Sequence, residues 1–391
     1  MKTKKACNVF FMVIAMGFML FGGLFAAQAF GQNQFHTTSS GAWSDQGIWF
    51  CFTCVNGPYI PNGSSDRAQV DNNVNLDINA TVQNLTIAPG GSLSASGTSL
   101  SVGPDSQDPQ ALADFQLLSL SNSASITVNG AMEVVPVIGN AVMTIASGST
   151  LSDTGALTVG AGGGIQVTVT GQGSKWNTQG MLFLANGNLS IQAGGQVTDV
   201  NGNLGANGGG AVTVTVDGVG STWTSSSVLY VGGGNGTLTV QNGGLVTSNG
   251  GDIGEGAGNQ GLMTVSGSNS KWNDSGFLDV GDGGKGTLNI QNGGAVTSGV
   301  AIITTKSGAP GSAVTADGSN STWTVNGTLT VGQGDSGSLT IQNQGTVNVS
   351  GELTVGDGGN GTMTVSTQGV VSNHAATIGA QAGSNGTVTV T

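Results

Sequence analysis

Residues that could carry out chemistry are few and widely separated in this chain of 391 residues. The two histidines, His36 and His374, lie near opposite ends of the sequence, and Arg67 is its only arginine. A glycoside hydrolase needs two facing carboxylates, and a lyase for acidic polysaccharides needs a basic group beside its carboxylates. No two acidic residues are adjacent, and no nucleophile–base pair can be assembled. We therefore expect a protein that is not an enzyme and has no cofactor, with a polysaccharide lyase or hydrolase as the least favoured alternative.

Three glycine-rich segments match the pattern G-x-G-x-x-G, at residues 281–286, 332–337 and 356–361. A dinucleotide site needs a helix N-terminus after such a loop to hold the pyrophosphate. Strand-like residues follow each segment and the pattern repeats, so turns are favoured over nucleotide sites. The same turns hold three aspartates: Asp282, Asp335 and Asp357. We interpret them as solvated carboxylates in preference to weak cation ligands, and predict no metal site.

The two cysteines that follow the N-terminal leader, Cys51 and Cys54, form a Cys-x-x-Cys motif with three interpretations. A redox-active pair normally begins a helix beside a βαβ unit, which is absent here. A zinc site would need a second ligand pair, and the nearest histidine is His36. A local disulfide fits an exported protein in an oxidising compartment, and this is our prediction.

Four tryptophans recur at spacings of 47, 49 and 51 residues: Trp176, Trp223, Trp272 and Trp323. A fixed period of this size is typical of repeat architectures. The four rings are expected in line on one side of the molecule. We favour their packing over the core, and the alternative is a row of ligand-binding platforms for sugar rings.

An apolar-x-apolar-Gly step, such as Leu229-Tyr-Val231-Gly232, recurs every 20 to 28 residues from Leu157 onward. The tryptophan repeat therefore equals two turns of about 24 residues, with an extra loop on alternate turns. Each turn holds three short alternating pieces, which are too short to be stable unless stacked on their copies. This predicts an all-β fold, a single-stranded parallel β-helix that is right-handed. Twelve or thirteen turns would make a rod roughly 60 Å long.

Glutamine–asparagine pairs occupy one corner of alternate turns, and their asparagines are Asn242, Asn292 and Asn343. Asparagine tolerates the left-handed backbone conformation, and stacked amides can bond along the axis. We predict an internal structural ladder in preference to a ligand site.

The pattern divides the chain into four segments. Residues 1–29 are predicted to be a secretory signal peptide, because three lysines precede an apolar run from Val9 to Leu24 and Ala27-Gln28-Ala29 supplies the small residues that a signal peptidase accepts; an uncleaved anchor is the alternative. Residues 30–80, with both cysteines and the densest group of aromatic side chains, are expected to form an N-terminal cap. Residues 81–156 would form irregular first turns, with a loop or an irregular coil over 103–120. Residues 157–391 would form the regular repeats.

Charge is sparse and one-sided, because Lys2, Lys4 and Lys5 lie in the leader and only five basic residues face twenty acidic ones after it. Nucleic-acid binding needs a basic stripe, so it is excluded. Anionic membrane surfaces are disfavoured for the same reason, and we expect no membrane insertion of the mature chain. The expected partners are a surface glycan, a surface protein or a second copy of the chain.

The motif G-S-x-W-T, followed by L-x-V-G-x-G-x-x-G-T-L-T-V-Q-N-G-G-x-V-T-S, resembles the repeat of autotransporter (type V secretion) passengers and of some PEP-CTERM-associated exoproteins. The close match covers residues 157–391, about 60% of the chain. The resemblance implies a right-handed β-helix at the surface of a Gram-negative bacterium. No translocator barrel and no sorting tail follow the repeats, so the sequence is either a fragment or a protein with another export route.

Together these features predict an exported, non-enzymatic β-helical module that acts as a stalk or adhesin-like structure. Its expected location is the cell surface, the extracellular space or the outer membrane, with the periplasm as an alternative. A carbohydrate-binding module that uses the tryptophan row is the alternative function.

Overall fold

The computed structural model describes residues 33–51, 60–63, 65–88, 91–103, 110–113, 117–134, 141–160, 163–205, 210–307 and 311–391. The chain divides into two units at residue 32, and only the second, Asn33–Thr391, is described. The predicted leader and Cys54 lie outside the described residues. Apart from the 3-10 turn η1 (Gln46–Ile48), the regular elements described are strands. Within the described residues, no helix is long and apolar enough to cross a membrane.

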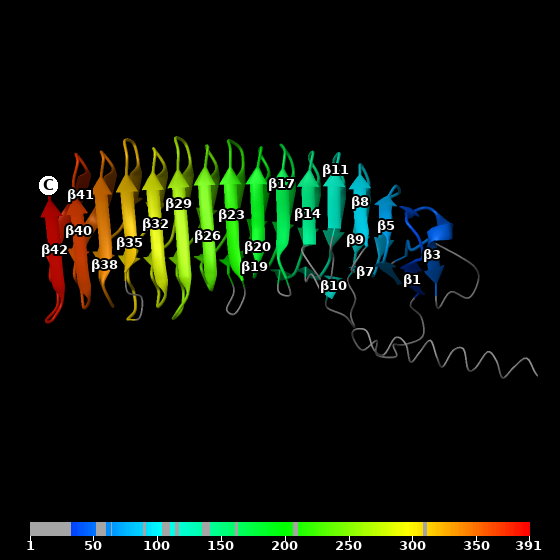
Figure 1. Cartoon of the computed structure of the whole chain (residues 1–391), viewed down its shortest axis with the longest axis horizontal. Coiled ribbons are helices and arrows are strands. Elements are labelled where there is room, and N and C mark those ends of the chain that lie inside the picture. The colour runs from blue at the N-terminus through cyan, green and yellow to red at the C-terminus, as the bar shows by residue number, and fades with distance from the viewer. Residues whose placement is uncertain are drawn as a thin grey trace, which may run out of the picture. The chain divides into compact units, whose positions relative to one another are not determined.

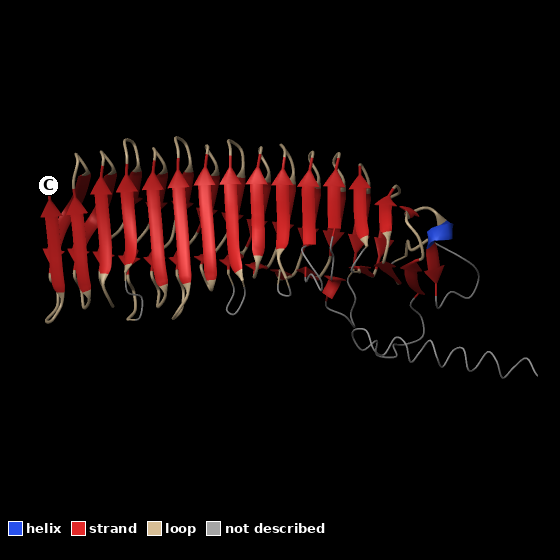
Figure 2. Ribbon diagram, viewed as in Figure 1, coloured by secondary structure: helices blue, strands red, loops and turns tan. Residues whose placement is uncertain are grey.

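The longest ladder is a parallel sheet of 15 strands, here called the broad face (Figures 1 and 2). Strands about 4.8 Å apart give this sheet a length of about 67 Å. Its strands are β2 (Gly41–Ala42), β5 (Asn73–Leu76), β8 (Ser92–Ser96), β11 (Leu117–Ser121), β14 (Ala141–Ala146), β17 (Ile165–Thr170), β20 (Gly187–Gln192), β23 (Ala211–Asp217), β26 (Asn235–Gln241), β29 (Gln260–Ser266), β32 (Lys285–Gln291), β35 (Ser312–Asp317), β38 (Gly337–Gln342), β40 (Asn360–Val365) and β42 (Asn385–Val390).

A second parallel ladder, the tryptophan face, holds the four repeat tryptophans. Its strands are β6 (Ala80–Val82), β9 (Ser99–Val102), β12 (Ser125–Val128), β15 (Thr150–Asp153), β18 (Lys175–Thr178), β21 (Gln196–Asp199), β24 (Thr222–Ser225), β27 (Leu245–Ser248), β30 (Lys271–Asp274), β33 (Ala295–Ser298) and β36 (Thr322–Val325).

A third ladder, the step face, holds the apolar-x-apolar-Gly steps. Its strands are β1 (Asn33–Thr37), β4 (Asp66–Val70), β7 (Asn84–Ile87), β10 (Gln110–Ala113), β13 (Ala131–Val134), β16 (Leu157–Val159), β19 (Met181–Leu184), β22 (Asn201–Leu204), β25 (Leu229–Val231), β28 (Gly251–Ile253), β31 (Leu278–Val280), β34 (Ala301–Ile303) and β37 (Leu329–Val331). β39 (Thr346–Val355) and β41 (Val370–Ile378) continue both of these faces.

Alternation of apolar and polar residues explains the arrangement, because successive side chains of a strand point to opposite sides. In β26 the burial pattern alternates, so that Leu238 and Val240 face inward while Thr237 and Thr239 face outward. The inward side chains form one hydrophobic core that continues from Phe35 to Val365. The predicted all-β parallel solenoid is confirmed.

The first turns belong to the same ladders. β1, β2, β4 and β5 lie inside the segment expected to be a cap, yet each pairs in parallel with a strand of a later turn. Likewise, β10 and all but the last residue of β11 lie inside the segment expected to be a loop or an irregular coil. The segments on either side of residues 80 and 156 therefore share one architecture. A β-helix turn needs inward-facing apolar residues, and it can form without the glycine-rich motif.

What distinguishes the first turn is an aromatic cluster and one antiparallel strand. β3 (Trp49–Cys51) runs antiparallel to β1. The rings of Trp43 and Trp49 are buried and meet edge to face, with centroids 4.9 Å apart. Cys51 is disulfide-bonded. Since Cys54 lies outside the described residues, its pairing with Cys51 stays a prediction.

Candidate functional site

The four repeat tryptophans are core residues. Each ring has 0% of its surface exposed. In the ladder they alternate with smaller apolar residues in one inward column: Leu151, Trp176, Val197, Trp223, Val246, Trp272, Val296, Trp323 and Val347. The row of sugar platforms does not fit this geometry, because no ring face is open to a ligand. The packing interpretation does fit it.

Small residues on the neighbouring step face make room for the indole rings. The inward column there reads Leu182, Gly202, Leu229, Gly251, Leu278, Ala301 and Leu329. A Cβ atom on Gly202 would lie 2.8 Å from Cζ2 of Trp223, and one on Gly251 would lie 2.5 Å from Cζ2 of Trp272. Each of these rings therefore fills space left by a glycine on the preceding turn. The two-turn repeat is a packing unit, in which a turn with tryptophan and leucine follows a turn with valine and a small residue.

A buried polar column runs beside the tryptophans, which the sequence analysis did not anticipate. It occupies the last position of the tryptophan-face strands and consists of Asp153, Thr178, Asp199, Ser225, Ser248, Asp274 and Ser298. All seven side chains are at most 5% exposed. The sequence could have revealed this polar column. Each of its residues stands two positions after a repeat tryptophan, or after the apolar residue that occupies the same place in a turn without tryptophan.

Hydrogen bonds join this polar column between turns. Thr178 donates from Oγ1 to Oδ2 of Asp153 at 2.7 Å, and Ser225 donates from Oγ to Oδ1 of Asp199 at 2.6 Å. The indole of Trp223 donates from Nε1 to Oδ2 of Asp199 at 2.5 Å. Such bonds satisfy buried oxygens that burial would otherwise penalise.

Burial dominates the protonation of the column carboxyls. It raises the pKa of Asp153 to about 7 and that of Asp199 to about 6, although the hydroxyl bonds oppose the shift. Burial also raises the pKa of Asp274. Compared with the unfolded chain, the folded chain thus favours the protonated, neutral form of these carboxyls.

The tryptophans differ in whether their indole N–H is paired, which predicts unequal effects of Trp→Phe substitutions. Nε1 of Trp176 has no hydrogen-bond partner, whereas that of Trp223 bonds to Asp199. Trp223→Phe should therefore lower the free energy of unfolding by about 1–3 kcal/mol more than Trp176→Phe. Urea titrations of the two variants measure this difference, and equal losses would contradict it.

The predicted asparagine ladder lies on the surface. Asn242, Asn292 and Asn343 do adopt the left-handed conformation, with φ of 54°, 55° and 51°. Their side chains are exposed, and each donates from Nδ2 to the preceding turn: to Asp217, Ser266 and Asp317, respectively. The prediction that the ladder is internal is wrong, because a corner residue with this backbone points its side chain outward. The bonds do run along the axis.

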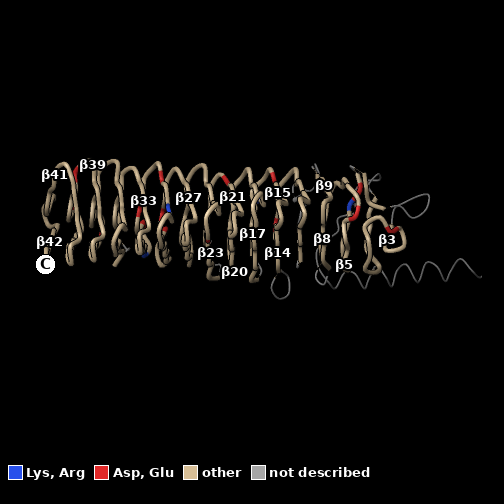
Figure 3. The backbone as a smooth tube through the Cα atoms, turned by 90° about the horizontal axis from the view of Figure 1, so that it is seen from above, with Lys and Arg blue, Asp and Glu red and all other residues tan. Residues whose placement is uncertain are grey.

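The clearest departure from the repeat is an acidic cluster on the outer side of the step face. Its outward column reads Thr158, Phe183, Asn203, Tyr230, Asp252, Asp279, Ile302, Thr330 and Thr354. Asp252 and Asp279 are register partners on β28 and β31. Asp282 follows in the turn after β31, and Lys306 ion-pairs with it across 2.8 Å between Nζ and Oδ2. In Figure 3, acidic and basic positions lie together near β33, as they also do near β5, on a tube that is mostly uncharged.

Glycine turns allow this cluster to form. The backbone N–H of Gly256 donates to the carbonyl of Asp282 at 2.8 Å, and the Thr305 N–H donates to the carbonyl of Gly281 at 3.0 Å. A Cβ atom on Gly284 would lie 2.5 Å from the carbonyl oxygen of Gly256. Successive turns thus stack directly on one another. The G-x-G-x-x-G segments are turns, and a strand follows each.

Burial and mutual repulsion set the protonation of the cluster. Asp252 is 4% exposed, and desolvation with the charges of Asp282, Asp279 and Glu255 raises its pKa to about 8. Desolvation and the charge of Asp282 raise the pKa of Asp279 to about 6. The bond and charge of Asp282 raise the pKa of Lys306.

The cluster escaped the sequence analysis because its members are joined by stacking and not by adjacency. Aligning the middle residue of each apolar-x-apolar-Gly step would have placed Asp252 beside Asp279. In the described part of the chain, no three His, Cys, Asp or Glu side chains form a metal-ligand group.

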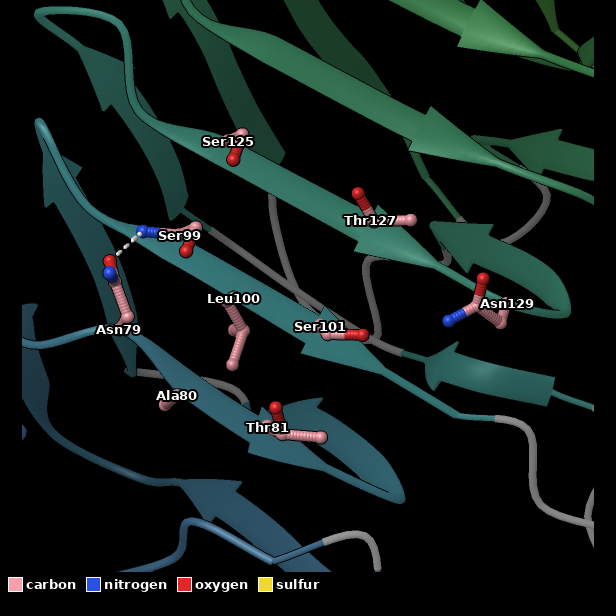
Figure 4. Close-up of a pocket in the computed structure, with 9 residues that line it drawn as sticks. All are labelled: Asn79, Ala80, Thr81, Ser99, Leu100, Ser101, Ser125, Thr127 and Asn129. Atoms are coloured by element: carbon pink, nitrogen blue, oxygen red, sulfur yellow. Dashed lines mark hydrogen bonds between the residues drawn. The ribbon is translucent and has the colours of Figure 1, made fainter.

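The outer surface also carries ladders of hydroxyl and amide side chains. One shallow hollow on the tryptophan face is lined by Thr81, Ser99, Ser101, Ser125 and Thr127, together with two asparagines (Figure 4). On the broad face, one outward column, the threonine column, consists of Thr144, Thr168, Ser190, Thr215, Thr239, Thr264, Asn289, Thr315, Thr340, Thr364 and Thr389. The column carries no charge.

Comparisons with known proteins add one structural similarity. No protein-family model and no curated protein matches this chain. In structure, it is similar to the crystal structure of a hyper-glycosylated TibA fragment whose glycosylation is catalysed by TibC. The two chains are 16% identical, 94% of each is covered, and the TM-score is 0.43. A similarity of this level carries no statement about function.

Proposed function

We propose that this chain is an exported, non-enzymatic spacer at the cell surface, with adhesin-like contacts along its sides. The observation that carries the proposal is the unbroken register of the broad face, in which each added turn extends the same core columns. In such a solenoid each turn contacts only its neighbours, so length can be added without a new fold.

The adhesin-like part of the proposal rests on the outward ladders. Hydroxyl and amide groups at intervals of about 4.8 Å offer many weak hydrogen bonds to a glycan or a protein surface. Weak contacts in parallel give avidity without a deep pocket. The buried tryptophans support no separate carbohydrate-binding function.

This proposal can be tested with beads that carry the chain, applied to surfaces coated with acidic or neutral polysaccharides. The two measurements are the fraction of beads retained and the amount of soluble sugar released. The proposal expects bead retention above that of albumin-coated beads and no release of soluble sugar. Sugar release would contradict the non-enzymatic assignment, and retention equal to albumin on every surface would contradict the adhesin-like contacts.

If the chain is a spacer, the length of the solenoid should be proportional to its number of turns. Deleting residues 223–271 removes one two-turn unit and rejoins equivalent positions, so the rod should shorten by about 10 Å. Small-angle scattering measures the maximum dimension of both chains. An unchanged dimension, or loss of the β-sheet circular dichroism, would contradict a modular rod.

A further inference from the structure

Four oxygen-bearing side chains meet on three successive turns of the step face. Asp252 and Asp279 point to the same side from adjacent strands about 4.8 Å apart. Asp282 and Thr305 are brought to them by the backbone bonds of their turns, Gly256 N–H to Asp282 and Thr305 N–H to Gly281. The side chains therefore lie within one local patch.

Two of these oxygens are buried without a hydrogen-bond partner, Oδ1 of Asp252 and Oδ1 of Asp282. The hydroxyl of Thr305 lies beside the carboxyl of Asp279, and hydrogen bonding to it opposes the rise in the pKa of Asp279. Asp252 is the decisive residue, because it is 4% exposed and is repelled by the charges of Asp282, Asp279 and Glu255. A buried carboxylate without a partner costs free energy unless a proton or another cation compensates it.

The positive charge of Lys306 compensates only part of the patch. Its Nζ reaches Oδ2 of Asp282, but its side chain is 65% exposed and so is readily displaced. The oxygens that Lys306 does not contact belong to carboxylates and to one hydroxyl group. This mixture suits a hard divalent cation, which takes six to eight oxygen ligands in flexible geometry.

We propose that Asp252, Asp279 and Asp282, with the hydroxyl of Thr305, bind one calcium ion, which takes the place of the Lys306 ammonium. The carboxylates do not form a closed ligand group by themselves. The ion draws them together by cancelling their repulsion, and water completes its coordination. The bound ion ties three turns together at the point where the outward column departs from the repeat.

Calcium binding to the full chain is tested by calorimetric titration with CaCl2 and by thermal unfolding in CaCl2 or EDTA. One ion per chain is expected, with a Kd of about 10⁻⁴–10⁻³ M, as in extracellular modules. At 10 mM CaCl2 the melting temperature should rise by about 2–4 °C. Affinity should increase from pH 6 to pH 9, because binding displaces the proton held by the cluster.

Variants separate this site from general charge screening. Asp252→Asn should melt higher than the wild type in EDTA, because an amide can be buried without taking up a proton, and should lose the response to calcium. Asp357→Asn is the matched control, since Asp357 follows Gly356 as Asp282 follows Gly281, and it should keep the full response. Lys306→Ala should bind calcium more tightly. A wild type that binds no calcium, or a response that persists in Asp252→Asn, would overturn the proposal.

Discussion

The free energy of unfolding should be greatest near pH 4 and should fall by several kcal/mol as the pH rises to about 8. The groups responsible are the buried carboxyls whose pKa values are raised in the folded chain: Asp153 to about 7, Asp199 to about 6, Asp252 to about 8 and Asp279 to about 6. This is the reverse of acid denaturation, in which carboxylates are stabilised by folding.

The sign follows from proton counting. Between the ordinary aspartate pKa of about 3.8 and the raised values, the folded chain binds more protons than the unfolded chain. Raising the pH through this window therefore pulls the equilibrium toward the unfolded state. Each of these groups contributes its full stabilisation below pH 4 and loses it by the time the pH passes its folded pKa.

Urea titrations at pH 4.5, 6.5 and 8.5 without calcium check this prediction, with tryptophan fluorescence as the probe. The transition midpoint should fall with each step. Asp153→Asn and Asp252→Asn should flatten the dependence, because an amide has no proton to lose, whereas Asp357→Asn should not alter it. A midpoint that stays constant or rises with pH would contradict the raised pKa values of these buried carboxyls.

The second large effect concerns the two-turn packing unit. Gly251→Leu should destabilise the chain strongly, because a Cβ atom alone would already lie 2.5 Å from the ring of Trp272. Trp272→Val should also cost about 3–5 kcal/mol, since it leaves a cavity in the core. The double variant Gly251→Leu/Trp272→Val should lose less than the sum of the two, because leucine fills the space that the indole vacates.

A double-mutant cycle in urea measures this coupling, which should favour the double variant by at least about 1 kcal/mol. Pairing Gly251→Leu with Trp323→Val is the control. Trp323 lies two turns beyond Trp272, so these two losses should simply add. Additivity of the neighbouring pair would refute the packing unit.

The fold could be predicted from the sequence because a solenoid is encoded locally. The step from Leu229 to Gly232 and its copies give the turn length, and alternation in β26 gives the inward columns. The early turns were misjudged because only inward apolar residues are needed there, and 30–80 has those without the glycine motif.

Details that depend on stacking could not be predicted from adjacency. Asp252 and Asp279 are far apart in sequence and become neighbours only through the register of β28 and β31. The burial of the tryptophans depends likewise on Gly202 and Gly251, which belong to other turns. The outward direction of Asn242 follows from its left-handed backbone at a corner, which the repeat alone does not reveal.

The proposal that this rod acts as a spacer with adhesive sides is tested most directly by displaying residues 33–391 on cells through a fused membrane anchor. Cell attachment to polysaccharide-coated surfaces is then counted under flow. We predict that the full rod increases attachment over the anchor alone, and that deletion of residues 223–271 gives an intermediate value, because reach and contact area both shrink. Attachment equal to that of the anchor alone would contradict the proposed function.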